Sequence, residues 1–250
     1  HLSIRRQRQM CIRDRQLTPT SFGEFNSDSP TIWQPIDVST LTPGTNGFYL
    51  DFEDSGTLGN DIFGNGDFAN TNLAATDQMS DTPTNNWAIW NSAVYTDVVF
   101  SEGNTIAVNA TAWGATASTI ALPNSGKWYY ELQVSSTSVY GIMGFMPYEE
   151  EMKDGTPDGN GDFIGYQTND TFYNGGGYEE NKFSHSSSAN DIYMFAADVT
   201  DNAAVDFYIG VNGTWFGSGD PAAGSNPAVN NFNCSTKTWS PGVWLYLSLI

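Results

Sequence analysis

Apolar and polar residues alternate along the second half of the chain, and this alternation predicts β-strands rather than helices. The clearest case is the segment 205–216, in which one strand runs into Asn212-Gly213 and a second begins directly after it. Asn-Gly accommodates the two positive φ angles of a type I′ turn, so this segment predicts a tight hairpin. The first strand of the hairpin has an apolar side formed by Val205, Phe207, Ile209 and Val211.

Two segments upstream of the hairpin also predict strands of a sheet. In residues 126–134, aromatic and aliphatic side chains alternate with Tyr129, Glu131 and Gln133, so one side of the strand is apolar. Residues 191–198 form a nearly continuous apolar run, which is typical of a strand covered on both sides. The apolar side of the earlier strand consists of Trp128, Tyr130, Leu132 and Val134.

The first half of the chain contains shorter and weaker patterns. Residues 16–45 are rich in Ser, Thr, Pro and Asp and predict an extended connector, whereas residues 46–52 predict one short strand. No helix longer than one turn is expected, and residues 148–153 are the candidate for that turn. Short apolar runs predict the entry strands of a β-sandwich at residues 98–100, 105–108 and 118–122.

The order and spacing of four segments resemble the SPRY domain. These segments are G-K-W-Y-Y-E, Y-G-I-M-G-F, D-I-Y-M-F-A-A-D and V-D-F-Y-I-G-V-N-G-T-W. Residues 212–222 and 224–228 look especially well matched to the family, and the resemblance covers residues 125–246. It implies an all-β fold, an antiparallel two-sheet β-sandwich of the concanavalin A-like jelly-roll type. It also implies binding of partners through loops at one end, and not catalysis.

A second resemblance concerns the residues before this domain. The Gly, Asn and Asp-rich loop 56–72 is similar to a segment of laminin-G and concanavalin A-like modules, with Phe63 where Ser would be expected. The longer stretch 45–86 looks like a segment found beside SPRY domains in structural proteins of tailed phages and marine viruses. Residues 46–124 are expected to be a linker with the entry strands of the sandwich. The resemblances imply that the connector 16–45 is the tail of a truncated upstream lectin-like domain.

The two ends of the chain are expected to be non-native. Residues 1–15 carry five of the nine basic residues, and residues 5–9 and 10–15 correspond codon by codon to a transposase-type sequencing adapter. Residues 247–250 correspond to the reverse complement of the end of that adapter. We therefore expect a metagenomic fragment whose native part runs from about residue 16 to residue 246. The alternative is a genuine basic arm that contacts nucleic acid or membrane.

The expected native part is strongly acidic. It retains four lysines against 27 acidic residues, a net charge of −23. Such a surface repels polyanions, so neither nucleic acid nor an anionic membrane is an expected partner. Cys234 would be the remaining cysteine and is expected to act as a small buried hydrophobe. His185 lies in a polar segment and is expected to be a surface-loop histidine.

The sequence disfavours an enzyme. A jelly-roll glucanase needs paired carboxylates on one strand, and no E-x-D-x-x-E pattern occurs. The nearest cluster is Asp51-Phe-Glu53-Asp54, which a solvated strand edge explains better. No catalytic residue is therefore assigned.

One segment suggests a calcium site, and no other cofactor is expected. Asp158, Asn160 and Asp162 place oxygen ligands at alternate positions. An EF-hand is excluded, because Phe163 stands at the sixth position in place of Gly and Asn169 at the twelfth in place of Glu. An irregular calcium site and a simple turn both remain open. A weaker second candidate, with the same alternative, consists of Asp61, Asn65 and Asp67.

Aromatic residues among flexible polar ones are the candidate ligand-binding residues. Tyr148 follows a predicted strand, while Tyr173 and Tyr178 lie on either side of a segment that begins at Asn174. Aromatic faces beside amide groups suit sugars or peptide surfaces. The alternative for each aromatic residue is a place in the core. Packing is the expected role of Trp128, Trp215 and Trp244.

These features predict a non-catalytic recognition or structural module of a phage virion appendage, such as a tail or tail fibre. The expected partner is a host-surface glycan or a neighbouring virion protein, and homo-oligomerisation through regions beyond the fragment is a further expectation. The alternative function is a SPRY-type protein–protein adaptor in a cellular protein. A glycan-cleaving enzyme is the third and disfavoured class.

Overall fold

The computed structural model describes residues 17–27, 30, 32–83, 85–109, 113–136, 139–148 and 163–247. The chain forms two compact units, His1–Trp87 and Ala88–Ile250. Both expected adapter segments lie outside the described residues, except that Leu247 ends the last strand. Within the described residues no helix has the length and apolar composition of a membrane span.

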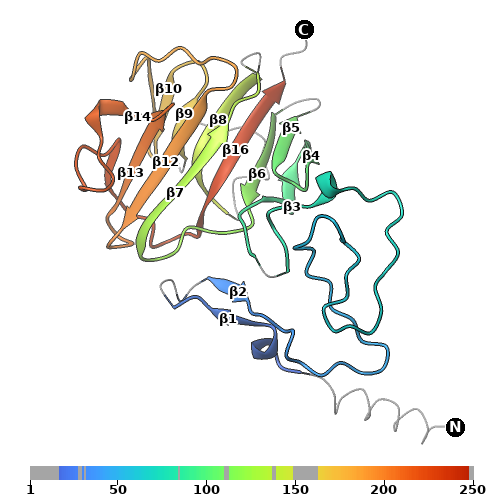
Figure 1. The fold of residues 1–250 in the computed structure, drawn as a ribbon. Helices are drawn as coiled ribbons and strands as arrows, with labels where there is room; N and C mark the ends of the chain where they lie inside the picture. Colours follow the sequence, from blue (N-terminus) through green and yellow to red (C-terminus); the bar gives the residue numbers. More distant parts are fainter. Residues whose placement is uncertain are drawn as a thin grey trace, which may run out of the picture. The chain divides into compact units, whose positions relative to one another are not determined.

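The second unit contains two large antiparallel sheets (Figure 1). The strand order of the seven-stranded sheet is β11 (Tyr178–Glu180), β10 (Thr171–Asn174), β9 (Ile164–Gln167), β8 (Val139–Pro147), β16 (Trp239–Leu247), β6 (Trp113–Ser118) and β3 (Trp90–Thr96). The five-stranded sheet has the order β14 (Thr214–Trp215), β13 (Val205–Val211), β12 (Ile192–Val199) and β7 (Gly126–Gln133), and β15 (Val229–Phe232) also pairs with β13.

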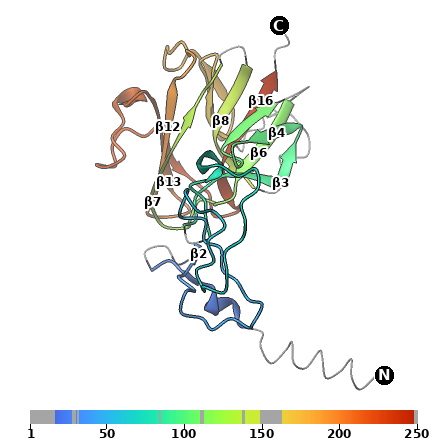
Figure 2. The ribbon, with the colours of Figure 1, turned by 45° about the vertical axis from the view of Figure 1, so that its right-hand side comes forward.

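The two sheets pack face to face, which confirms the predicted all-β antiparallel sandwich. Figure 2 separates the layer of β7, β12 and β13 from the layer of β8, β16 and β6. Phe145 of β8 joins the layers, because its ring centroid lies 5.2 Å from that of Tyr130 and 4.9 Å from that of Phe207. Tyr130 also donates a hydrogen bond from its hydroxyl to the carbonyl oxygen of Gly144, at 2.6 Å. The space between the sheets is therefore an aromatic core.

The strands with the strongest alternation form as predicted. In β7 the residues alternate between half-buried and exposed, with Tyr130 inward and Tyr129 and Glu131 outward. Strand β12 pairs with β7 and β13, and its consecutive residues 193–197 are all buried, so both faces are covered as the continuous apolar run predicts. The hairpin after β13 turns at Asn212 (φ 47°) and Gly213 (φ 82°), the two positive φ angles of a type I′ turn.

Three weaker predictions have different outcomes. Strands β4 (Val98–Ser101) and β5 (Ile106–Asn109) form a two-stranded ribbon where two entry strands were expected. The strand predicted at residues 118–122 is wrong, because β6 ends at Ser118. The strand predicted at residues 46–52 is also wrong: no ladder forms there, and Phe52 has a positive φ of 57°. Most of the predicted helical turn 148–153 lies outside the described residues.

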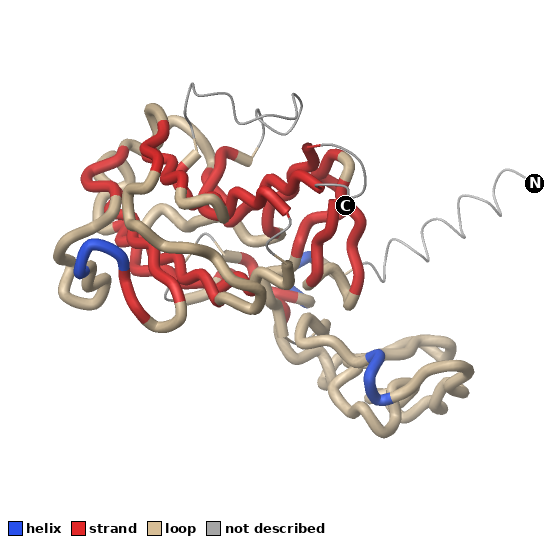
Figure 3. The backbone as a smooth tube through the Cα atoms, turned by 90° about the horizontal axis from the view of Figure 1, so that it is seen from above, coloured by secondary structure: helices blue, strands red, loops and turns tan. Residues whose placement is uncertain are grey.

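The first unit has little regular structure, and loops form most of its path in Figure 3. Part of the predicted extended connector is a ribbon of β1 (Gly23–Phe25) and β2 (Trp33–Pro35). Two short 3₁₀ turns occur at Pro19–Ser21 and Ala75–Asp77. Hydrogen bonds from side chains to the backbone stabilise part of the loop structure. The carboxylate of Asp61, for example, accepts hydrogen bonds from the N–H groups of Tyr49, Phe63 and Asn65. These Asx-type bonds replace a strand ladder.

Candidate functional site

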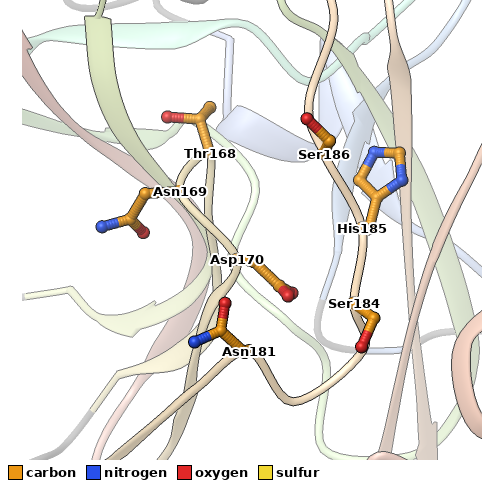
Figure 4. A pocket seen from close by; sticks show the side chains of 7 residues that line it. All are labelled: Thr168, Asn169, Asp170, Asn181, Ser184, His185 and Ser186. Carbon is orange, nitrogen blue, oxygen red and sulfur yellow. The ribbon is translucent and has the colours of Figure 1, made fainter.

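A polar depression of about 380 Å³ lies in the second unit (Figure 4). One side is the turn between β9 and β10, and the other is the loop that connects β11 to β12. In Figure 4 the carboxylate of Asp170 points toward the segment that carries Ser184 and His185, with Asn181 beside it. The lining consists of Thr168, Asn169, Asp170, Asn181, Ser184, His185 and Ser186.

Asp170 forms the base of the depression. It is 6% exposed, and its φ of 66° completes the turn between β9 and β10. Its carboxylate accepts a hydrogen bond from the hydroxyl of Tyr166 at 2.6 Å. Its carbonyl oxygen accepts one from the N–H of Asn181 at 2.8 Å. Asp170 therefore links the turn to the opposite loop and to the core below.

A second buried carboxylate, Asp191, organises the end of the same loop. One of its oxygens accepts a hydrogen bond from the N–H of Ser188 at 2.7 Å and lies 3.3 Å from Nε2 of His185. Its other oxygen accepts a hydrogen bond from the side-chain amide of Asn212 at 2.8 Å. Burial acts to raise the pKa of Asp191, but these hydrogen bonds outweigh it, and the pKa lies below the ordinary 3.8. The ionised carboxylate thus fixes the loop.

Aromatic side chains support the depression from beneath. The ring of His185 lies 5.8 Å from that of Phe216 and 5.9 Å from that of Tyr193, measured between centroids. Burial, together with the hydrogen bond to Asp170, raises the pKa of Tyr166 far above 10, and burial raises that of Tyr193 to about 12. Both hydroxyl groups therefore stay protonated at neutral pH and serve as fixed hydrogen-bonding groups.

His185 is consequently more constrained than predicted. As predicted, it lies in a surface loop, but its side chain is only 21% exposed and its Nε2 lies 3.3 Å from a carboxylate oxygen of Asp191. The rim presents amides and hydroxyls from Asn169, Asn181, Ser184 and Ser186. Such groups bind the main chain of a peptide or the hydroxyls of a sugar by hydrogen bonds.

The ribbon of β10 and β11 brings together three of the predicted ligand-binding residues. Tyr173 and Tyr178 are direct cross-strand partners, with ring centroids 6.1 Å apart. The side-chain oxygen of Asn174 accepts the N–H of Gly176 at 3.2 Å, so this side chain shapes the turn. Tyr178 is 57% exposed, whereas Tyr173 is half-buried.

Tyr148 and Tyr173 contact the same group of buried side chains on the seven-stranded sheet. That group consists of Ala115, Ala117, Ile142, Met146, Phe163 and Trp244. The hydroxyl of Tyr148 also accepts a hydrogen bond from the side-chain amide of Asn91 at 2.5 Å. Packing therefore accounts for Tyr148 and for much of Tyr173, and the exposed aromatic surface of the predicted set comes from Tyr178.

The first predicted calcium ligands, Asp158, Asn160 and Asp162, lie outside the described residues. In the second candidate, hydrogen bonds from three backbone N–H groups occupy the carboxylate of Asp61. The hydrogen bond from the Tyr49 N–H is the largest cause that lowers the pKa of Asp61 below 3.8. The turn interpretation explains this carboxylate. Across the described ranges, no group of three His, Cys, Asp or Glu residues could hold a metal ion.

The predicted packing residues have the expected surroundings. Cys234 is 1% exposed, and burial raises the pKa of its thiol to about 12, so it is protonated and unreactive at neutral pH. Trp244 is fully buried, and Trp128 packs against the main core. Trp215 is half-buried and borders a surface on the outer side of the five-stranded sheet.

Sequence reasoning missed the residues that organise the depression. Asp170, Asn181 and Ser184 have positive φ angles of 66°, 54° and 54°. A run of Asn, Asp and Ser around a predicted turn signals such angles, but it does not show which turns meet in space.

Comparison with known proteins gives a likeness at the level of the fold. No family model and no curated protein sequence matches the chain. The solved SPRY domain of human HERC1 is 14% identical, with a TM-score of 0.48, and the match covers 64% of this chain and 91% of that one. A second human SPRY domain is 15% identical, with a TM-score of 0.42 and coverage of 62% and 98%. These values describe a partial likeness of fold and say nothing about activity.

Proposed function

We propose that this protein is a non-catalytic recognition module that binds its partner at the polar depression. The observation that carries this proposal is the contrast between the base and the rim. Asp170 and Asp191 are buried and fixed by hydrogen bonds, while the rim presents side-chain amides and hydroxyls. A rigid base beneath adaptable polar groups is the arrangement that binding loops on a β-scaffold use.

The partner offers hydrogen-bonding groups rather than a charged phosphate backbone. Asn169 and Asn181 supply amide donors and acceptors, and Ser184 and Ser186 supply hydroxyls. The net charge of the whole chain is −19, which disfavours polyanions. A peptide main chain and a neutral glycan both match this chemistry.

The more specific proposal places the module in a virion appendage, a phage tail or tail fibre. Its support is the resemblance of residues 45–86 to segments of phage and marine-virus structural proteins. In that setting the partner is a host-surface glycan or a neighbouring virion protein.

The test combines a glycan array with a pull-down of virion proteins by the full chain, each with two variants. Asn181→Asp changes the rim and keeps a residue type that tolerates positive φ. Asn231→Asp, an exposed position with φ 53° on β15, is the matched control. We expect Asn181→Asp to weaken the binding roughly tenfold and Asn231→Asp to leave it within about twofold.

Three outcomes would overturn parts of this proposal. If both variants bind as tightly as the unchanged chain, the depression is not the binding site. Capture of cellular proteins without any virion protein or glycan would favour the adaptor function. Release of reducing sugar from host polysaccharide would show an enzyme.

A further inference from the structure

The outer face of the five-stranded sheet carries a second surface, separate from the polar depression. One row of residues crosses the sheet: Glu131 of β7 pairs with Met194 of β12, Met194 with Gly210 of β13, and Gly210 with Trp215 of β14. Tyr129 precedes Glu131 by two residues and lies on the same side of β7. Tyr129 and Glu131 are exposed on this side, whereas residues 193–197 of the neighbouring strand β12 are buried.

Tyr129 and Glu131 are held in a fixed relation. The ring of Tyr129 packs edge-on against Trp215, with centroids 6.1 Å apart. Its hydroxyl donates a hydrogen bond to one carboxylate oxygen of Glu131. Burial, followed by this bond and the charge of Glu131, raises the pKa of Tyr129 to about 12, so the hydroxyl stays a donor. The Tyr129 side chain nevertheless remains 53% exposed.

The floor beneath this pair is closed. Met194 is 6% exposed, and a Cβ on Gly210 would lie 2.6 Å from the terminal methyl group of Met194. Because Gly210 has no side chain, the terminal methyl group of Met194 can occupy the space beside it. A partner group can reach the ring and the carboxylate from above but cannot insert between the strands.

The basic residue of β7, Lys127, does not form an ion pair with the carboxylate of Glu131. Lys127 is on the same side of β7, but its Nζ donates to the carbonyl oxygens of Pro221 and Ala222 and pairs with Asp198 at 3.2 Å. Among the described residues, no ion pair includes Glu131, and its second oxygen accepts no hydrogen bond. An exposed ring beside an unneutralised carboxylate complements a planar cation.

We propose that Tyr129 and Glu131, supported by Trp215, bind an arginine side chain of a partner protein. The guanidinium group stacks on the exposed ring of Tyr129 and donates hydrogen bonds to the carboxylate of Glu131. Arginine suits both contacts, because its guanidinium is planar, stacks on aromatic faces and pairs with carboxylates through two N–H groups. The net charge of −19 favours approach of such a partner. The inference does not depend on the function proposed for the polar depression.

The test is an NMR titration of the full ¹⁵N-labelled chain with the peptide N-acetyl-Gly-Arg-Gly-amide. We expect saturable shifts of the indole N–H of Trp215 and of the amides of Tyr129 and Glu131, with a Kd on the order of millimolar. The neutral citrulline peptide should bind roughly tenfold more weakly, and the lysine peptide several-fold more weakly.

Two variants separate this site from general attraction to an acidic surface. Glu131→Gln should weaken the binding of the arginine peptide roughly tenfold, measured as a rise in its Kd. Glu180→Gln is the matched control, because it removes one exposed carboxylate that also stands two residues after an exposed tyrosine, Tyr178. Within the described part of the chain, Tyr178 has a ring contact with Tyr173 and none with a tryptophan. The control variant should change the Kd less than about twofold. Equal losses in both variants, equal binding of arginine and lysine peptides, or shifts confined to other amides would overturn the proposal.

Discussion

The two compact units of this chain reach order by different means. In the sandwich unit, paired strands enclose a core in which Phe195 and Phe207 are completely buried. In the described part of the first unit, Leu58 is the buried hydrophobic residue, while Phe48 and Phe68 are 57% and 48% exposed. Carboxylates such as Asp61 hold its backbone instead. The comparison teaches that hydrophobic burial stabilises one unit globally, whereas side-chain-to-backbone hydrogen bonds order the other locally.

The largest effect should come from the sandwich core. Phe207→Ala removes a fully buried ring that contacts Phe145 and Trp239, so we expect a loss of about 3–5 kcal/mol in the unfolding free energy of the sandwich. Urea unfolding followed by tryptophan fluorescence measures this loss. Val99→Ala, at a 57% exposed position of β4, is the control and should cost less than about 1 kcal/mol. Similar losses of unfolding free energy in both variants would show that burial in the core is not the main source of the stability of the sandwich.

A smaller effect is expected at the hairpin turn. Asn212→Ala forces alanine into a φ of 47° and removes side-chain hydrogen bonds to Asp191 and to the N–H of Ile192. We expect a loss of about 2–3 kcal/mol. Asn231→Ala, at a φ of 53°, is the control for backbone strain and should cost about 1 kcal/mol. If the two variants lose equal stability in urea, the side-chain hydrogen bonds of Asn212 add nothing measurable, and the loss comes from the positive φ alone.

The contribution of Asp191 should depend on pH. Its folded-state pKa is below 3.8, so the ionised carboxylate stabilises the sandwich above that pH. This stability is lost as the pH falls through the folded-state pKa. Asp191→Asn should therefore lower the unfolding free energy by about 1 kcal/mol at pH 7 and should leave it unchanged in strong acid. Urea unfolding of both proteins from pH 7 to pH 2 gives the comparison. Parallel curves over the whole range would contradict a titrating role.

The parts of the fold that could be predicted from the sequence are those set by neighbours along the chain. The alternation in β7 follows from the two-residue period of a strand, and the turn at Asn212-Gly213 follows from local backbone preference. These local signals predict the strands and the hairpin, whereas the arrangement in two stacked sheets was implied by the resemblance to the SPRY domain.

The candidate site could not be predicted in the same way. Asp191 meets Asn212 across 21 positions, and Tyr166 reaches the carbonyl oxygen of His185 across 19, so strand pairing creates these contacts. The failed strand at residues 46–52 has a related cause. Asp61, 12 residues further on, binds the N–H of Tyr49 that a ladder would need. Alternation alone does not reveal such a competitor.

The smallest and most local effect should occur in the first unit. Asp61→Ala removes the acceptor for the N–H groups of Tyr49, Phe63 and Asn65, so these three amides should exchange with solvent faster. The amides of β12 and β13 should keep their protection, because a separate core encloses them. Hydrogen exchange followed by NMR resolves both sets. Asp37→Ala is the control, since Asp37 accepts a single backbone N–H, that of Ser39, among the described residues. If Asp61→Ala instead speeds exchange throughout β12 and β13, the two units unfold together, and the contrast between global burial and local hydrogen bonding does not hold.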